Sequence, residues 1–352
     1  MTPARDSWPN PALALFLCIA AGAVFAWLRV PLPWMLGPLA AMAACNFAGA
    51  GLRAARGARE AGQVVIGTAL GLYFTPAVGR EVLSYWAVLL AAGLFAIVLG
   101  VLGGWILARL AAVDPGTAFF ASVPGGAAEM TLLGERYGAR PDRIALAQSL
   151  RILMVVIIVP FALTYSGAHG MDLYALASLP LDWRRLALLL ALAATAGSLA
   201  ARLRLPNGFM FGPLAATIAF TVSELQFSPM PSVLSNAAQV LIGCALGARF
   251  ERRSLRSAPG YVAAVVLSVL AGVAVAAAFG ALLALTTGLS VATLVLATAP
   301  GGIAEMCITA KVLQLGVPLV TAAHVTRVFL LILSTGPTYR AARALQARVR
   351  IE

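Results

Sequence analysis

The stretch VPGGAAEM, residues 123–130, returns as APGGIAEM at residues 299–306, so that Pro300 follows Pro124 by 176 residues. Proline removes a backbone donor and two glycines lower the free-energy cost of leaving the helix. Each stretch is therefore predicted to interrupt a helix. We call Pro124, Gly125 and Gly126 the first tip, and Pro300, Gly301 and Gly302 the second tip. Two such tips in one apolar chain favour a site shared between two halves.

The same offset relates residues far from the tips, including Gln63 to Gln239 and Arg151 to Arg327. A whole half of the chain has therefore been duplicated. The first repeat is predicted over residues 1–176, with its interrupted segment at 115–139. The second is predicted over 177–352, with its interrupted segment at 291–316.

Composition places the chain in a membrane: 61% of its 352 residues are hydrophobic and 11% are charged. A soluble core could not enclose that much apolar material. We expect an all-α polytopic protein. Two apolar stretches, 115–133 and 291–310, contain the tips, and ten others are long enough to cross a bilayer: 11–29, 34–52, 61–79, 82–108, 144–165, 184–201, 208–225, 233–250, 260–286 and 318–339.

Charge placement separates two topologies. If all twelve stretches cross, the arginine-rich ends fall on both sides of the bilayer. If each tip segment instead returns to the side it left, most arginines share one face, which the positive-inside rule makes cytoplasmic. Only Arg29 and the pair Arg184 and Arg185 run against that pattern; the clusters that follow it are Arg53/Arg56/Arg59, Arg136/Arg140/Arg143, Arg249/Arg252/Arg253/Arg256 and Arg340/Arg343/Arg348/Arg350.

The second topology gives each half five crossings, and five is an odd number. The two repeats would then be inverted relative to each other, each with five transmembrane helices and one re-entrant or broken tip segment. The expected location is the inner (cytoplasmic) membrane, multi-pass, with both termini in the cytoplasm. The net charge of +12 then reflects orientation in the lipid bilayer, and no nucleic-acid partner is expected.

The tips themselves predict a cavity. Unpaired backbone in hydrocarbon costs several kcal/mol unless protein or water covers it. Residues 127–133 and 303–310 can each begin a new helix whose free N–H groups and positive dipole end face that cavity. The alternative is a packing kink, because glycine and proline are common in transmembrane helices.

Glu129 and Glu305 lie in the first turn of these new helices. Each carboxylate could simply cap its own helix. A carboxylate within a bilayer is also expensive and usually functional, so a proton or cation site is the second interpretation.

Arg151 and Arg327 lie about 10 residues, or roughly 15 Å, along the helices that begin near Pro141 and Pro318. At that depth neither side chain reaches an interface easily. The nearest expected partners are Glu129 and Glu305, in a structural ion pair, or an anionic solute held by the guanidinium.

Gln63 and Gln239 open the segments QVVIGTALG and QVLIGCALG. Glycines four residues apart form a face for close helix packing, which is their expected role. The two glutamines could donate hydrogen bonds into the cavity.

Enzyme chemistry finds little support in the sequence. The only histidines are His169 and His324, and the four cysteines stand alone in apolar stretches. No metal-ligand spacing, nucleophile motif or dinucleotide fingerprint occurs. We therefore expect no cofactor, no metal and no catalytic residue.

The duplicated PGG-x-A-E-M element, the Q-V-(V/L)-I-G-x-A-L-G segment and the S-L-R or V-T-R helix resemble the AbrB-duplication membrane protein family across nearly the whole chain. Its members are often labelled ammonia monooxygenase or regulator, and the family shares its name with an unrelated DNA-binding regulator. The layout is also similar to inverted-repeat secondary transporters. That second likeness implies a mobile core that carries two hairpins, beside a scaffold of the other helices.

The leading prediction is a secondary transporter of a small, anionic organic solute coupled to H⁺ or Na⁺. The solute would sit at the midplane between the tips, near Arg151, Arg327, Gln63 and Gln239, with Glu129 and Glu305 available for coupling. The alternatives are a membrane monooxygenase or its subunit, and a membrane sensor or regulator. The sequence also allows a homodimer.

Overall fold

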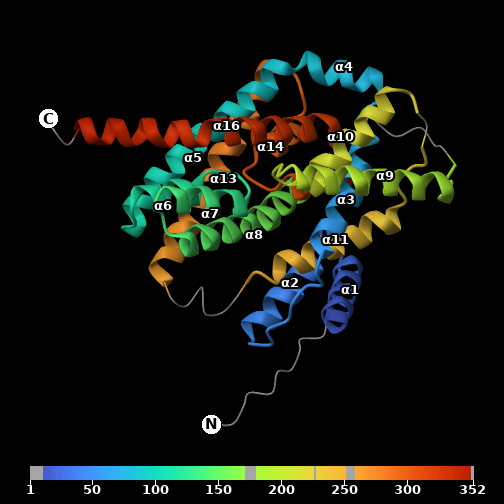
Figure 1. Ribbon diagram of the computed structural model, residues 1–352, viewed down its shortest axis with the longest axis horizontal. Coiled ribbons are helices and arrows are strands. Elements are labelled where there is room, and N and C mark those ends of the chain that lie inside the picture. The colour runs from blue at the N-terminus through green and yellow to red at the C-terminus, as the bar shows by residue number, and fades with distance from the viewer. Residues whose placement is uncertain (1–10, 171–179, 226, 251–257, 350–352) are drawn as a thin grey trace, which may run out of the picture.

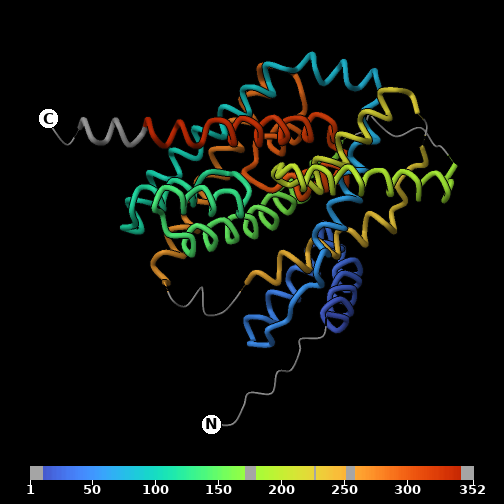
Figure 2. Tube along the Cα trace, in the orientation of Figure 1, coloured from blue at the N-terminus to red at the C-terminus, as the bar shows by residue number. Residues whose placement is uncertain are grey.

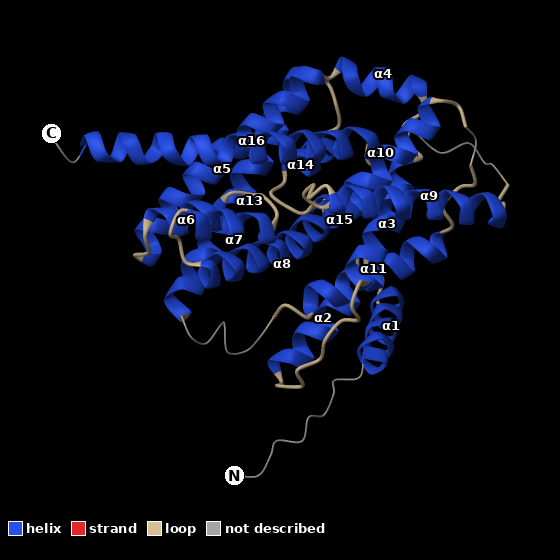
Figure 3. Ribbon diagram, in the orientation of Figure 1, coloured by secondary structure: helices blue, strands red, loops and turns tan. Residues whose placement is uncertain are grey.

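Figure 1 shows the computed structural model, which describes residues 11–170, 180–225, 227–250 and 258–349. These residues form helices joined by short loops, with no strand among them (Figure 3). Arg252, Arg253, Arg256, Arg350 and the N-terminus, which belong to the predicted cytoplasmic face, lie outside the described residues.

Apart from α4, the described helices of the two halves follow the same order. In the first half they are α1 (Pro11–Trp27), α2 (Pro33–Phe47), α3 (Ala58–Gly71), α4 (Pro76–Ser84), α5 (Trp86–Ala111), α6 (Pro115–Ser122), α7 (Ala127–Arg136) and α8 (Pro141–Tyr165). In the second half they are α9 (Trp183–Arg202), α10 (Gly208–Val222), α11 (Ser232–Gly247), α13 (Pro259–Thr287), α14 (Val291–Thr298), α15 (Ile303–Val312) and α16 (Val317–Val349).

Five helices are long and apolar enough to cross a membrane: α5, α8, α9, α13 and α16. Several shorter apolar helices, α1, α10 and α11 among them, accompany these five. The chain is therefore a multi-pass membrane protein, as its composition predicts.

The predicted span 61–79 is wrong at its end. Helix α3 stops at Gly71, and the chain bends by 89° into α4. Thr75 accepts a hydrogen bond from the amide of Val78 and Pro76 follows at the first helical position, so a new helix starts here. The predicted stretch 34–52 also ends early, at Phe47, because Gly49 and Gly51 take left-handed backbone conformations.

Six helices, α1, α2, α3, α9, α10 and α11, pack into what we call the glycine bundle. A Cβ at Gly67 would lie 2.6 Å from the carbonyl oxygen of Met210, and one at Gly243 would overlap that of Met35. These close approaches bring α3 against α10 and α11 against α2, which is the packing role predicted for the glycines. Helices α2 and α3 of the first half therefore pack on α11 and α10 of the second half, respectively, so that each contacts the counterpart of the other.

The remaining helices other than α4, namely α5–α8 and α13–α16, form the hairpin bundle. Here too the halves exchange partners, because α5 packs on α16 while α13 packs on α8. Phe95 of α5 stacks on Phe279 of α13 with ring centroids 4.1 Å apart. Figure 2 shows how the chain passes between the two bundles.

Both interrupted segments fold back as hairpins. At the base of the first, the amide of Arg140 donates to Thr117 Oγ1 at 2.9 Å, so the segment ends where it began. At the base of the second, a Cβ at Gly316 would lie 3.1 Å from Thr293 Cγ2. The predicted interruption of both helices is confirmed, because α6 ends at Ser122 and α14 ends at Thr298.

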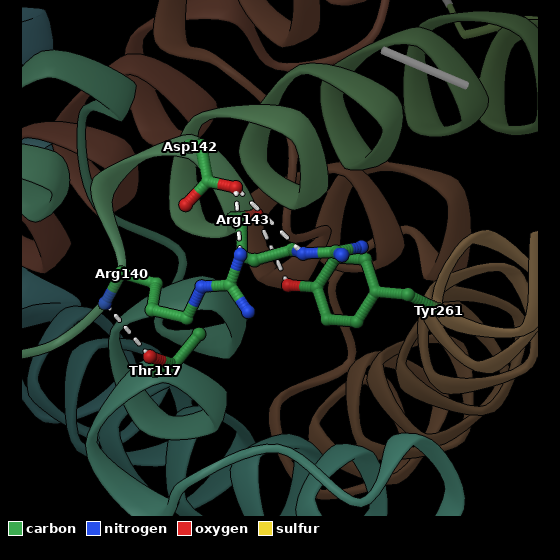
Figure 4. A network of polar contacts seen from close by, with 5 residues as sticks. All are labelled: Thr117, Arg140, Asp142, Arg143 and Tyr261. Atoms are coloured by element: carbon green, nitrogen blue, oxygen red, sulfur yellow. Dashed lines mark hydrogen bonds and ion pairs between the residues drawn. The ribbon is translucent and has the colours of Figure 1, made fainter. Parts of the chain in front are cut away.

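A polar network anchors the first hairpin (Figure 4). Asp142 contacts Arg140 at 3.3 Å and Arg143 at 3.7 Å, while the hydroxyl of Tyr261 donates to the carbonyl oxygen of Arg143 at 3.0 Å. The Arg143 guanidinium lies 5.0 Å from the centroid of the Tyr261 ring. The hairpin base, α8 and α13 are thereby held together within the hairpin bundle.

Candidate functional site

The two tips have nearly the same backbone. Val123 has φ −58° and ψ 126°, and Ala299 has φ −57° and ψ 137°. Gly126 has φ −68° and ψ 138°, and Gly302 has φ −76° and ψ 155°. Any residue can adopt these extended conformations, so the tip glycines are not required by backbone geometry.

Close side chains explain the glycines instead. A Cβ at Gly125 would lie 2.8 Å from Met130, and one at Gly301 would lie 2.8 Å from Met306. At the second glycine of each tip, an added Cβ would overlap the carboxylate of the glutamate three residues later. The motif PGG-x-A-E-M is thus a compact unit in which the glutamate and the methionine fold back over the two glycines.

The two buried arginines hold these tips. Arg151 donates from Nη1 to the carbonyl oxygen of Val123 at 2.9 Å and from Nη2 to that of Gly125 at 3.3 Å. Arg327 makes the matching bonds to Ala299 at 2.7 Å and Gly301 at 2.6 Å. Each guanidinium spans the helix break and donates to carbonyl groups that the interrupted helix leaves without a backbone N–H donor.

This arrangement corrects the expected ion pairs. Within the described part of the chain, neither Arg151 nor Arg327 lies within 4.0 Å of a carboxylate. The reason is local: the carbonyl groups before and within each tip come closer to the guanidinium than Glu129 or Glu305 does. The Nε of each arginine is also buried without a hydrogen-bond partner among the described residues.

A second pair of side chains supports the tips. Gln148 Nε2 donates to the carbonyl oxygens of Phe120 and Val123, both at 2.9 Å. His324 Nε2 lies 3.0 Å from the carbonyl oxygen of Leu296, which can only accept. Sequence reasoning gave neither residue a role, although the offset of 176 pairs these two positions.

Both tips line one cavity of about 60 Å³ between the two bundles. A cavity of that volume is large enough to hold water. Among the predicted site residues, nine line it: Gln63, Pro124, Gly125, Gly126, Arg151, Gly301, Gly302, Glu305 and Arg327. We call this the tip cavity.

Three predicted residues lie elsewhere. Pro300 lines a neighbouring apolar cavity of about 150 Å³ between α5 and α13, which also reaches Arg151. Glu129 is half-buried and Gln239 is buried, and neither lines the tip cavity. Gln239 instead donates to Asn236 Oδ1 at 3.4 Å. The cavity thus uses the two repeats unequally.

Sequence reasoning missed Arg59, Asn207 and Arg249, which line the cavity from one end of the glycine bundle. A signal existed for Arg59, because it precedes Gln63 by four residues and so shares its helix face. Arg249 follows the end of α11, and its position could not be read from a periodic pattern.

The cavity is strongly positive. Four arginines line it, and Glu305 is the only lining carboxylate among the described residues. Arg249 is within electrostatic range of Arg59, and also of Glu60, Glu129 and Glu305. Arg151, Arg327 and Glu305 are each buried. An excess of buried positive charge favours an anion, because desolvated charges need a partner.

A metal ion has no obvious ligands here. Across the described residues, no group of three or more histidine, cysteine and carboxylate side chains is close enough to hold one. The four cysteines are free thiols.

The sequence model of the AbrB family, described as transition state regulatory protein AbrB, matches residues 34–343. The chain belongs to the AbrB family. It is 28% identical over 328 residues to the Escherichia coli (strain K12) protein named "Putative regulator AbrB", covering 92% of each chain. It is also 28% identical over 298 residues to the Bacillus subtilis (strain 168) protein YhjN, covering 79% of this chain and 77% of that one. The AbrB resemblance drawn from the duplicated motifs is confirmed.

Proposed function

We propose that this AbrB-family protein is a secondary active transporter of a small, anionic organic solute. One observation carries the proposal: two interrupted helices, one from each repeat, line a single cavity that contains four arginines. Broken helices whose ends meet at a buried site are the usual substrate-binding device of inverted-repeat carriers.

An anion is the ligand that the cavity's electrostatics favour. Helices α7 and α15 begin at Ala127 and Ile303, which both line the cavity, so the positive ends of two helix dipoles adjoin it. Arg59 and Arg249 add charge without a hydrogen bond to the tips. The volume of about 60 Å³ limits the solute in this conformation to a small one.

The membrane arrangement belongs to the same proposal. Each repeat would cross five times and carry one re-entrant hairpin, so the repeats would be inverted in the inner membrane with cytoplasmic termini. Support comes from the exchanged helix pairs, α2 on α11 with α3 on α10, and α5 on α16 with α8 on α13. A two-fold relation between the repeats produces this reciprocal packing.

Coupling to H⁺ or Na⁺ would use Glu305. Its carboxylate lines the cavity and is buried, whereas Glu129 is half-buried and lies outside the lining. A buried carboxylate beside an anion site is favourable when it binds a cation or a proton together with the anion.

Uptake by proteoliposomes tests the proposal. The probes are radiolabelled acetate, lactate, succinate and glutamate, each with an imposed proton or sodium gradient. We expect saturable uptake of at least one probe, and at least a tenfold loss in Arg249→Ala, because a cavity charge is removed without loosening either tip. Arg109→Ala is the matched control, since Arg109 lies over Trp105 and outside the cavity lining. Equal uptake by the two variants would overturn the anion site.

Regulation is the second candidate function, favoured by the name of the Escherichia coli relative. A membrane sensor would bind its anion in the same cavity without moving it. Thermal stabilisation of the purified protein by one of these probes, with no flux in vesicles, would favour the sensor over the transporter.

A further inference from the structure

The two hairpins meet the glycine bundle differently. Helix α15 of the second hairpin packs against α3. Its counterpart in the first repeat, α7, makes no contact of similar extent with α11 among the described residues. The second hairpin is thus docked on the glycine bundle, while the first is less closely attached.

A hydrogen bond joins the two bundles beside the docked hairpin. Lys311, near the end of α15, donates from Nζ to Ser235 Oγ near the start of α11 at 3.3 Å. Ser235 is buried and Lys311 is half-buried. Neither residue lines the tip cavity, which instead extends to Arg59, Asn207 and Arg249.

The duplication supplies a counterpart for this contact. The offset of 176 residues, which pairs Gln63 with Gln239, places Arg59 at the position of Ser235 and Glu135 at the position of Lys311. These two side chains carry opposite charges. Yet Arg59 lines the cavity, Glu135 is exposed, and neither forms an ion pair within the described part of the chain. The first repeat therefore has two side chains of opposite charge that form no ion pair, at the positions where the second repeat has the Lys311–Ser235 hydrogen bond.

We propose that Arg59 and Glu135 form an ion pair in a second conformation, in which the first hairpin docks on the glycine bundle and the Lys311–Ser235 contact is broken. The inference rests on the proposed transport function. We call the Lys311–Ser235 contact and the Arg59–Glu135 pair its two gates, of which one is closed at a time. When the Arg59–Glu135 gate closes, the end of the cavity near Arg59 is sealed and the opposite end opens. A two-fold relation between repeats generates the second state by exchanging their environments.

Cysteine cross-linking tests the two gates without any solute. In a background where Cys18, Cys45, Cys244 and Cys307 are replaced, one variant carries Ser235→Cys with Lys311→Cys, and another carries Arg59→Cys with Glu135→Cys. A direct disulfide needs Cβ atoms about 3.5–4.5 Å apart, whereas the long Lys and Arg side chains make their contacts across a wider gap. A short bifunctional thiol reagent spans that gap, so each cross-link reports one gate closed. The matched control is Glu60→Cys with Glu135→Cys, because Glu60 is the next residue of α3 on a different face.

We expect both gate pairs to be cross-linked in membranes, and the control pair to give a much lower yield. Adding Lys311→Ala should raise the yield of the Arg59/Glu135 cross-link several-fold, since it releases the docked hairpin. A yield no higher than that of the control, with and without Lys311→Ala, would overturn the gate.

Charge substitution adds a transport readout. Glu135→Gln removes one charge of the proposed pair at a residue outside the tip cavity and should reduce probe uptake at least tenfold, whereas Glu135→Asp, which keeps the charge, should retain most of it. Equal uptake by these two variants, together with no cross-link between positions 59 and 135, overturns the gate while the transporter stands. Cross-links at both gates with no uptake of any probe support the two conformations and overturn the transport function.

Discussion

The first and second tips share a backbone conformation and a bridging arginine, yet their surroundings differ. The second tip is the more buried: Glu305 is 6% exposed and lines the cavity, whereas Glu129 is half-buried and lies outside it. The local motif therefore sets the shape of a tip, while docking against α3 sets its environment. Matched substitutions in the two tips can measure that difference.

The largest expected difference is between Arg327→Ala and Arg151→Ala. Loss of Arg327 leaves the carbonyl oxygens of Ala299 and Gly301 without the donors that the described structure gives them. Loss of Arg151 leaves only that of Gly125, since Gln148 still donates to Val123. At about 1–3 kcal/mol for each unsatisfied buried group, we expect losses of about 2–6 and about 1–3 kcal/mol. Thermal unfolding in detergent, followed by tryptophan fluorescence, measures both.

Arg109→Ala serves as the control for general loss of charge, with an expected loss below about 1 kcal/mol. Equal destabilisation by Arg151→Ala and Arg327→Ala would contradict the unequal bonding of the tips.

The second comparison is Gly302→Ala against Gly126→Ala. Both backbones accept alanine, but each new methyl group would overlap the following glutamate carboxylate. Glu305 is buried and has little room to move, whereas the half-buried Glu129 can rotate outward. We expect a loss of about 1–3 kcal/mol for Gly302→Ala and less than about 1 kcal/mol for Gly126→Ala. The reverse order in unfolding experiments would show that burial does not distinguish the two carboxylates.

The third comparison concerns coupling. Glu305→Gln should reduce gradient-driven uptake about tenfold and remove its dependence on the coupling ion, because Gln keeps the size but cannot bind a proton or a cation in the same way. Glu129→Gln should reduce uptake less than threefold, since Glu129 lies outside the cavity lining. Initial rates with and without the ion gradient measure both effects. Equal loss in the two variants would place the coupling role in both repeats.

The smallest effect is expected for His324→Gln. Glutamine stands at the equivalent position 148 and donates to the carbonyl oxygen of Phe120, so it should replace the imidazole donor to Leu296. We expect a change within about 0.5 kcal/mol, against about 1–3 kcal/mol for His324→Leu, which leaves the acceptor unpaired. If the two substitutions destabilise equally, the hydrogen bond is not what His324 contributes.

Much of this molecule follows from its sequence. Composition predicts the multi-pass helical class, and the repeated PGG predicts both helix breaks, because proline and glycine act on the backbone within a few residues. Arg151 and Arg327 are also visible as charges too deep to reach an interface. These features depend on local chemistry or on the offset between the repeats.

What the sequence could not supply depends on packing between the repeats. The guanidinium of Arg151 donates to the carbonyl oxygens of residues 123 and 125, which the hairpin brings beside α8. No local sequence pattern predicts these carbonyl groups, rather than Glu129, as its partners. The exclusion of Gln239 from the cavity is likewise asymmetric, although Gln63 and Gln239 have nearly the same neighbours in sequence. The repeated motifs predict equal tips, and the difference between their surroundings appears only in the packed structure.

Anion protection of two engineered cysteines tests the shared site most directly. Ala127 and Ile303 both line the tip cavity, one at the start of α7 and one at the start of α15, whereas Ala128 is exposed and lies outside the lining. With the native cysteines replaced, a transported probe anion should slow thiol labelling of Ala127→Cys and Ile303→Cys with the same half-protecting concentration, and should leave Ala128→Cys unaffected. Protection at only one of the two tips, or at neither, would contradict a single anion site formed by both.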